Sequence, residues 1–217
     1  MSTFRPPTQL SRVVVLGNSG SLLSLPPQRR WGEDLVIGTN RILRPGIDGR
    51  RFNPDVMVLS DARPIETDRH MLEDFNGPVL CADWLGTDIA TDFFPAVPSR
   101  TRHRTQPIPH IHSNQWGDPV WSINSVTFQA AQLAMRMLAP GGMVIVAGAE
   151  RTWPGKDRPH HFYDTRHLHT GRKPFRVSQD FTFQWGVLAE LALGFGIHIV
   201  ECSPWEDLRL PLRHIDL

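Results

Sequence analysis

Six short segments of the chain contain uninterrupted apolar runs that are rich in valine, isoleucine and leucine. A run that is apolar on both of its faces is typical of a parallel β-strand that helices cover on both sides. We therefore predict strands at residues 12–16, 34–40, 54–61, 79–82, 143–148 and 197–201.

Apolar residues recur at helical spacing between these runs, most clearly from Asn124 or Ser125 to Leu138. Proline and glycine at 140–142 are expected to end that helix. Further helices are predicted at residues 64–75, 181–193 and 204–208. Strands that alternate with helices indicate one α/β domain, residues 1–217, with a mostly parallel, Rossmann-like sheet and helices on both of its faces.

The composition indicates the cellular compartment in which this domain works. Cys81 and Cys202 lie in or beside apolar runs, and we interpret them as buried thiols in a reducing compartment. No segment is apolar for long enough to span a membrane, and residues 1–11 lack the apolar core of a secretory signal. The chain is therefore expected to be cytoplasmic, with no membrane partner.

The charge balance bears on nucleic-acid binding. A formal net charge of +1 over 217 residues gives no global attraction to a polyanion. The basic cluster at residues 100–104 is interpreted as a solvated loop, with contact to an anion as the alternative.

The first predicted strand ends in the turn Gly17, Asn18, Ser19, Gly20 and Ser21. A glycine-rich turn between a strand and a helix is a context in which main-chain N–H groups and the helix dipole bind phosphate. The spacing matches neither the dinucleotide-binding fingerprint nor a Walker loop, which also needs a lysine. We interpret the turn as a ligand-binding element; the alternative is a tight turn that needs glycine only for its geometry.

Polar residues also follow the second and third strands and begin the long helix. Asn40 offers a donor and an acceptor to a base or a ribose, and Ser60 and Asp61 end the third strand. Asp61 could bind a hydroxyl or a metal, or cap a helix. Asn124 and Ser125 could bind an anion or a sugar at the helix N-terminus, or simply cap it.

The segment 149–177 is polar, basic and rich in histidine, and we predict that it forms a lid over the site. One histidine is the candidate general base, because imidazole titrates near neutral pH. The arginine and lysine side chains of this segment would neutralise a leaving phosphate. No cysteine pair or His-Glu-x-x-His spacing indicates a metal site. The histidines in question are His160, His161, His167 and His169.

Four motifs, taken in order, resemble a known group of enzymes. They are Gly-Asn-Ser-Gly-Ser-Leu at 17–22, Thr-Asn-Arg at 39–41, Ser-Ile-Asn-Ser-Val at 122–126 and Gly-Ala-Glu at 148–150. The set resembles the bacterial sialyltransferases of the Campylobacter type and related families, common in phages and archaea, that include proteins similar to 6-hydroxymethylpterin diphosphokinase. The resemblance covers residues 13–208, and the first motif is its specific part.

The resemblance implies roles for individual residues. Nucleotide binding carries over to residues 18–21 and Asn40, and contacts with the donor carry over to Asn124 and Ser125. The base carries over to His169 or His167.

One part of the family's pattern is missing from this sequence. The tyrosine pair that steadies the leaving phosphate is not reproduced, because Tyr163 is the only tyrosine. Arg151, Arg166 or Lys173 would take over that role.

The expected activity is transfer from a nucleotide-activated donor to an acceptor hydroxyl, as in a metal-independent glycosyltransferase. The nucleotide sugar is then a substrate, and no tightly bound cofactor is expected. A saccharide, a lipid-linked sugar and a hydroxymethylated DNA base remain open as acceptors, and so does assembly into a homo-oligomer. The alternatives are an ATP-dependent diphosphokinase, in which Asp61 would help to bind magnesium, and a phage nucleotide-binding protein without turnover.

Overall fold

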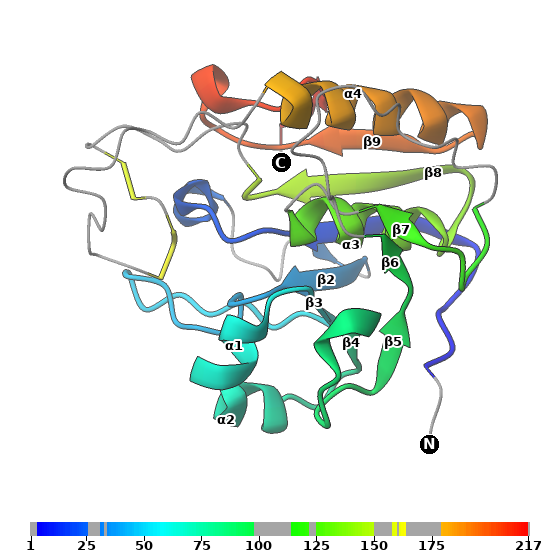
Figure 1. Ribbon diagram of the computed structural model, residues 1–217. Helices are drawn as coiled ribbons and strands as arrows, with labels where there is room; N and C mark the ends of the chain where they lie inside the picture. The colour runs from blue at the N-terminus through cyan, green and yellow to red at the C-terminus, as the bar shows by residue number, and fades with distance from the viewer. Residues whose placement is uncertain are drawn as a thin grey trace.

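The computed structural model describes residues 4–25, 31–32, 34–97, 114–121, 125–149, 158–159, 161–163 and 179–216, without the side chains of 179–181 and 208. Within these residues, eight strands form one sheet in the order β10-β9-β8-β1-β2-β3-β4-β5, and all neighbours pair in parallel (Figure 1). The strands are β1 (Leu10–Leu16), β2 (Leu35–Thr39), β3 (Val56–Leu59), β4 (Val79–Ala82), β5 (Asp92–Phe94), β8 (Leu138–Ala147), β9 (His198–Glu201) and β10 (Arg213–His214). The predicted α/β class with a mostly parallel sheet is confirmed.

The strand order places a topological switch point between β1 and β8. From β1 the chain adds β2 to β5 on one side, and it later returns to add β8, β9 and β10 on the other. In open parallel sheets, connections that leave in opposite directions open a crevice beyond the carboxyl ends of the two strands, where ligands bind. The turn that begins at Gly17 lies directly beyond β1.

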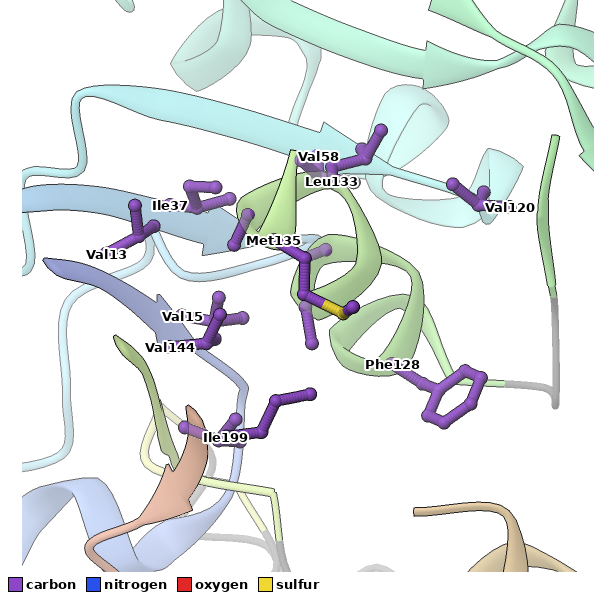
Figure 2. Close-up of a cluster of buried hydrophobic side chains, with 14 of the residues drawn as sticks. Val13, Val15, Ile37, Val58, Val120, Phe128, Leu133, Met135, Val144 and Ile199 are labelled. Carbon is purple, nitrogen blue, oxygen red and sulfur yellow. The ribbon is translucent and has the colours of Figure 1, made fainter. Parts of the chain in front are cut away.

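Two helices cover one face of the sheet. These are α3 (Val126–Met135) and α4 (Gln179–Gly194), and the rings of Phe128 and Trp185 meet edge to face between them at 5.0 Å. Figure 2 shows how Val13, Val15 and Val144 from the central strands pack toward α3. A small second sheet, β6 (Ala96–Val97) with β7 (Val120–Trp121), adds Val120 to the same core.

The opposite face is covered by shorter elements. They are the 3₁₀ helix η1 (Gly20–Ser24) and the helices α1 (Ala62–Thr67) and α2 (Arg69–Glu73). Phe162 is fully buried in this core, with its ring edge to face against Phe52 at 5.3 Å. Helices therefore lie on both faces, but only short ones on this side.

Several predicted boundaries were wrong. The helix predicted to reach Leu138 ends at Met135, because Leu10 pairs with Leu138 and draws that residue into β8. Residues 140–142 consequently lie inside the strand, where Gly141 takes a positive φ. The single helix predicted over 64–75 is split at Asp68.

Short elements were missed or differ in type from the prediction. β5, β6, β7 and β10 are two or three residues long, which is too short for a periodic signal. The predicted tail helix is the 3₁₀ helix η4 (Glu206–Leu208). None of the helices in the described part of the chain combines the length and the apolar character needed to cross a bilayer.

Both cysteines are buried, as predicted. Burial raises the pKa of the Cys81 thiol to about 12. A thiol with such a pKa is a packing group at neutral pH rather than a nucleophile.

Candidate functional site

The turn after β1 is bound by main-chain contacts to the end of β8. Gly17 N donates to Ala147 O at 2.8 Å, and Ser19 N donates to Gly148 O at 3.1 Å. These two N–H groups are therefore already engaged. The helix that follows the turn is the 3₁₀ helix η1, which is only five residues long and therefore offers a short helix dipole to a phosphate.

The two glycines of the turn are explained by close packing. A Cβ on Gly17 would collide with the carbonyl group of Gly148 and lie 3.1 Å from Thr127 Oγ1. A Cβ on Gly20 would collide with the carbonyl oxygen of Pro159 and lie 2.8 Å from its Cγ. Neither glycine has a positive φ. The glycines are thus required where other main-chain segments approach the turn.

Asn18 connects the ends of β1 and β2. Its Nδ2 donates to Thr39 O at 3.0 Å and to Thr39 Oγ1 at 3.2 Å, and Thr39 Oγ1 in turn donates to Leu16 O at 2.8 Å. Because a carbonyl oxygen must face the NH₂ group, this contact also fixes the direction of the amide oxygen. That oxygen, Asn18 Oδ1, is buried and has no hydrogen-bond partner within the described residues.

Two more buried oxygens at the same edge lack a partner in the described part of the chain. They are Ser19 Oγ, next to Asn18, and Asn40 Oδ1, next to Thr39. Asn40 has a φ of 45°, a conformation that asparagine tolerates better than most residues. An unpaired buried polar atom is costly, so the three oxygens at this sheet edge are the ones to which a ligand could supply hydrogen bonds.

A distant segment of the chain, residues 161–163, lies against this edge. Phe162 N donates to Asn18 O at 3.3 Å, and Ile47 N donates to Phe162 O at 2.8 Å. His161 Nδ1 is 3.2 Å from Asn18 O, and its ring stacks on that of Tyr163 with centroids 5.1 Å apart. Sequence reasoning placed these residues in a lid, and no local signal predicts this contact with Asn18.

Two arginines follow Asn40 and share one buried carboxylate. Arg44 Nε donates to Asp68 Oδ1 at 3.0 Å, and Arg41 Nε lies 3.2 Å from Asp68 Oδ2. The Arg44 guanidinium lies over the Tyr163 ring, 5.3 Å from its centroid.

Other predicted site residues have structural partners. Asp61 caps α1 by accepting from Arg63 N at 3.0 Å, and it forms an ion pair with the Arg63 guanidinium. Burial acts to raise the pKa of Asp61, but the hydrogen bonds from Arg63 outweigh it and hold that pKa below its ordinary value. Ser125 caps α3, with its Oγ 3.3 Å from Phe128 N.

Of the remaining predicted site residues, two lie in the described part of the chain. Ser60 follows β3 and is partly exposed, and Ser21 is fully buried within η1. Asn124, both candidate bases and all three candidate phosphate-stabilising residues lie outside the described residues. The last two groups are His167, His169, Arg151, Arg166 and Lys173.

A separate groove of about 550 Å³ lies at the opposite edge of the sheet. Asp55, which precedes β3, and Gly77, which precedes β4, both line it. No predicted site residue lines this groove, so it is distinct from the carboxyl-edge site. Its walls are formed by Leu43, Arg51, Phe52, Asn53, Pro54, Asp55, Met71, Asp74, Phe75, Asn76 and Gly77.

Comparisons with models of known protein families, with curated proteins and with solved structures found no match to this chain. The interpretation of the carboxyl-edge site therefore depends on its geometry and on the sequence motifs.

Proposed function

We propose that the chain is a transferase that binds a nucleotide-activated donor at the carboxyl ends of β1 and β2 and transfers a group to an acceptor hydroxyl. The observation that supports the proposal is the set of three buried oxygens, on Asn18, Ser19 and Asn40, that have no partner among the described residues. They lie beside the switch point of a parallel sheet, where nucleotides bind in open α/β folds.

The chemistry of these atoms favours a sugar or a base as the group that is bound there. Amide oxygens accept hydrogen bonds and do not donate them, so Asn18 Oδ1 and Asn40 Oδ1 require donors on the ligand. Ribose hydroxyls and the amino group of a base are such donors. Ser19 Oγ can pair with either kind of atom.

The transfer step needs a base for the acceptor proton. A histidine accepts the hydroxyl proton as the acceptor oxygen attacks the activated carbon, and the nucleotide leaves with the bonding electrons and its phosphate. His167 and His169 remain the candidates from the resemblance. His161 is a further candidate at this edge: its Nδ1 faces the carbonyl oxygen of Asn18, so Nδ1 carries the proton and Nε2 carries the lone pair of the neutral ring.

Thermal unfolding with a panel of nucleotides tests the proposal. Cytidine or uridine nucleotides at a hundredfold excess over Kd should raise Tm by roughly 5 °C or more. Stabilisation by ATP with magnesium alone would instead support diphosphokinase chemistry. No shift with any nucleotide would contradict the proposal.

Turnover separates an enzyme from a binding protein. The chain should release the stabilising nucleotide from its sugar conjugate. The rate of this release should be higher when an acceptor is present. A chain that binds the nucleotide but releases none of it from any conjugate would support the non-catalytic alternative.

A further inference from the structure

Asn18 and Asn40 occupy equivalent positions beyond two neighbouring strands. The last register pair of β1 and β2 joins Leu16 to Gly38, and each asparagine lies two positions further along its own strand direction. Neighbouring strands are about 4.8 Å apart. Asn18 Nδ2 also donates to Thr39 O at 3.0 Å, and Thr39 directly precedes Asn40. The register and this hydrogen bond place the two asparagines side by side at the carboxyl edge.

Both asparagines present a hydrogen-bond acceptor at this edge. The contact with Thr39 uses the NH₂ group of Asn18, so Asn18 Oδ1 points away from Thr39 O. Asn18 Oδ1 and Asn40 Oδ1 have no hydrogen-bond partner among the described residues, and the same holds for Ser19 Oγ between them in the turn. Each of these three residues is half-buried as a whole, so the edge borders on solvent. A ligand bound here must therefore bring donors to two adjacent amide oxygens.

The kind of donor distinguishes the parts of a nucleotide. Phosphate oxygens are acceptors, and the two amide oxygens would repel them. The amino group of a base is one donor atom for two acceptors, and it lies beside a ring nitrogen that is itself an acceptor. Two hydroxyls on neighbouring carbons offer two O–H donors that rotate to suit their acceptors. Each hydroxyl oxygen also accepts, and Ser19 Oγ can donate to it.

We propose that Asn18 and Asn40 form a ribose subsite, in which their amide oxygens accept from the 2′- and 3′-hydroxyls of the donor nucleotide and Ser19 Oγ donates to one of those hydroxyls. The inference rests on the proposed function and makes it more specific. It assigns the neighbouring strand ends to the sugar of the nucleotide rather than to its base or its phosphates. The chain then selects ribonucleotides over deoxyribonucleotides, and it does so whichever base the nucleotide carries.

Calorimetric titration with matched nucleoside 5′-monophosphates tests the subsite. Each ribonucleotide that binds is compared with its 2′-deoxy and 3′-deoxy counterparts. Removal of either hydroxyl should weaken binding about tenfold or more, because a buried amide oxygen loses its donor. The size of the loss should be the same for every base that binds.

Asn40→Gly assigns the loss to a particular side chain. Glycine keeps the positive φ of this position and removes one of the two amide oxygens. In this variant one of the two hydroxyl deletions should cost little further affinity, because its acceptor is absent, while the other should keep its full cost. Asn76→Gly is the matched control, since Asn76 is exposed and lines the groove at the opposite edge. It should show both losses as the wild type does.

The outcomes separate this inference from the proposed function. Nucleotide binding and transfer with equal affinity for ribonucleotides and both deoxy counterparts would overturn the ribose subsite alone. A preference for cytidine over uridine nucleotides that ignores the hydroxyls would assign the amide oxygens to a base amino group and also overturn it. Ribose-selective binding without transfer would support the subsite and remove the transferase. No binding of any nucleotide would overturn both.

Discussion

Asn40 combines a strained backbone with an unpaired side chain. Its φ of 45° is costly for most side chains, and its amide oxygen is buried without a partner in the described part of the chain. Residues held in this way cluster at ligand sites, where the backbone aims a side chain that the fold itself does not need.

Asn40→Gly separates these two properties, because glycine accepts the positive φ but has no amide. The variant should unfold at the same temperature as the wild type or slightly above it. It should bind the stabilising nucleotide about tenfold more weakly, as expected for the loss of a buried hydrogen bond. Equal nucleotide affinity in calorimetry would remove Asn40 from the site.

Gly17 and Gly186 form a matched pair for the close-packing explanation. Gly17→Ala forces a methyl group against Gly148 and should lower the free energy of unfolding by about 3 kcal/mol. Among the described residues, no atom lies within 4 Å of the position that a Cβ would take on Gly186 in α4, so Gly186→Ala should raise stability by roughly 0.5–1 kcal/mol. Urea unfolding of both variants measures the difference. Two variants of equal stability would contradict the packing at Gly17.

Cys81 should be inert in the folded protein. With a pKa of about 12, only on the order of one thiol in ten thousand is ionised at pH 8. A disulfide reagent should therefore label neither Cys81 nor Cys202 until urea unfolds the chain, since both are buried. Rapid labelling of Cys81 in the native state, detected by mass spectrometry, would disprove this.

At the scale of the elements, α1 depends on its cap. Asp61→Ala should cost about 1 kcal/mol at pH 7 through loss of the cap. Asp61→Asn keeps a capping oxygen and loses only the charge. Because the folded pKa of Asp61 lies below its ordinary value, the contribution of the charge is present above the unfolded pKa and is lost as the pH falls through the folded one.

Urea titrations at several pH values follow this effect. The stability difference between the wild type and Asp61→Asn should shrink as the pH is lowered below about 4. Nucleotide affinity should stay within a few fold in both variants, since the Asp61 carboxylate serves Arg63. A difference that grows at low pH, or a loss of nucleotide binding, would instead favour Asp61 as a ligand-binding residue.

The central strands and the outline of the site follow from local pattern. β1 and β2 are apolar on both faces. Asn40 directly follows β2 and Asn18 follows β1 after one glycine, so their positions at the strand ends indicate that they lie at one edge. The break at Asp68 has no such signal. It depends on ion pairs with arginines more than twenty positions earlier in the chain.

No local sequence signal places His161 and Tyr163 at the carboxyl edge of the sheet. Several histidines lie in the segment 149–177, and the resemblance points to His169 or His167 as the base, not to His161. What selects His161 is a contact with Asn18 across 143 positions, supported by the burial of Phe162 in the core. Three-dimensional packing of this kind leaves no periodic trace in a single sequence.

At the scale of the whole molecule, the two faces of the sheet have different roles. α3 and α4 cover one face with a continuous apolar core. On the other face, Arg41 and Arg44 in the turn after β2 meet Asp68 at the junction of α1 and α2. Figure 1 shows α1 and α2 together beside the strands from which this edge is built. The face with the shorter helices is therefore the one that carries the polar contacts beside the carboxyl-edge site.

A crystal structure with the most stabilising nucleotide would show directly whether the donor binds at the carboxyl ends of β1 and β2. We expect hydroxyl or amino groups of the nucleoside within hydrogen-bond distance of Asn18 Oδ1 and Asn40 Oδ1. A nucleotide bound in the groove beside Phe52 at the opposite edge, with the two amide oxygens still unpaired, would contradict it.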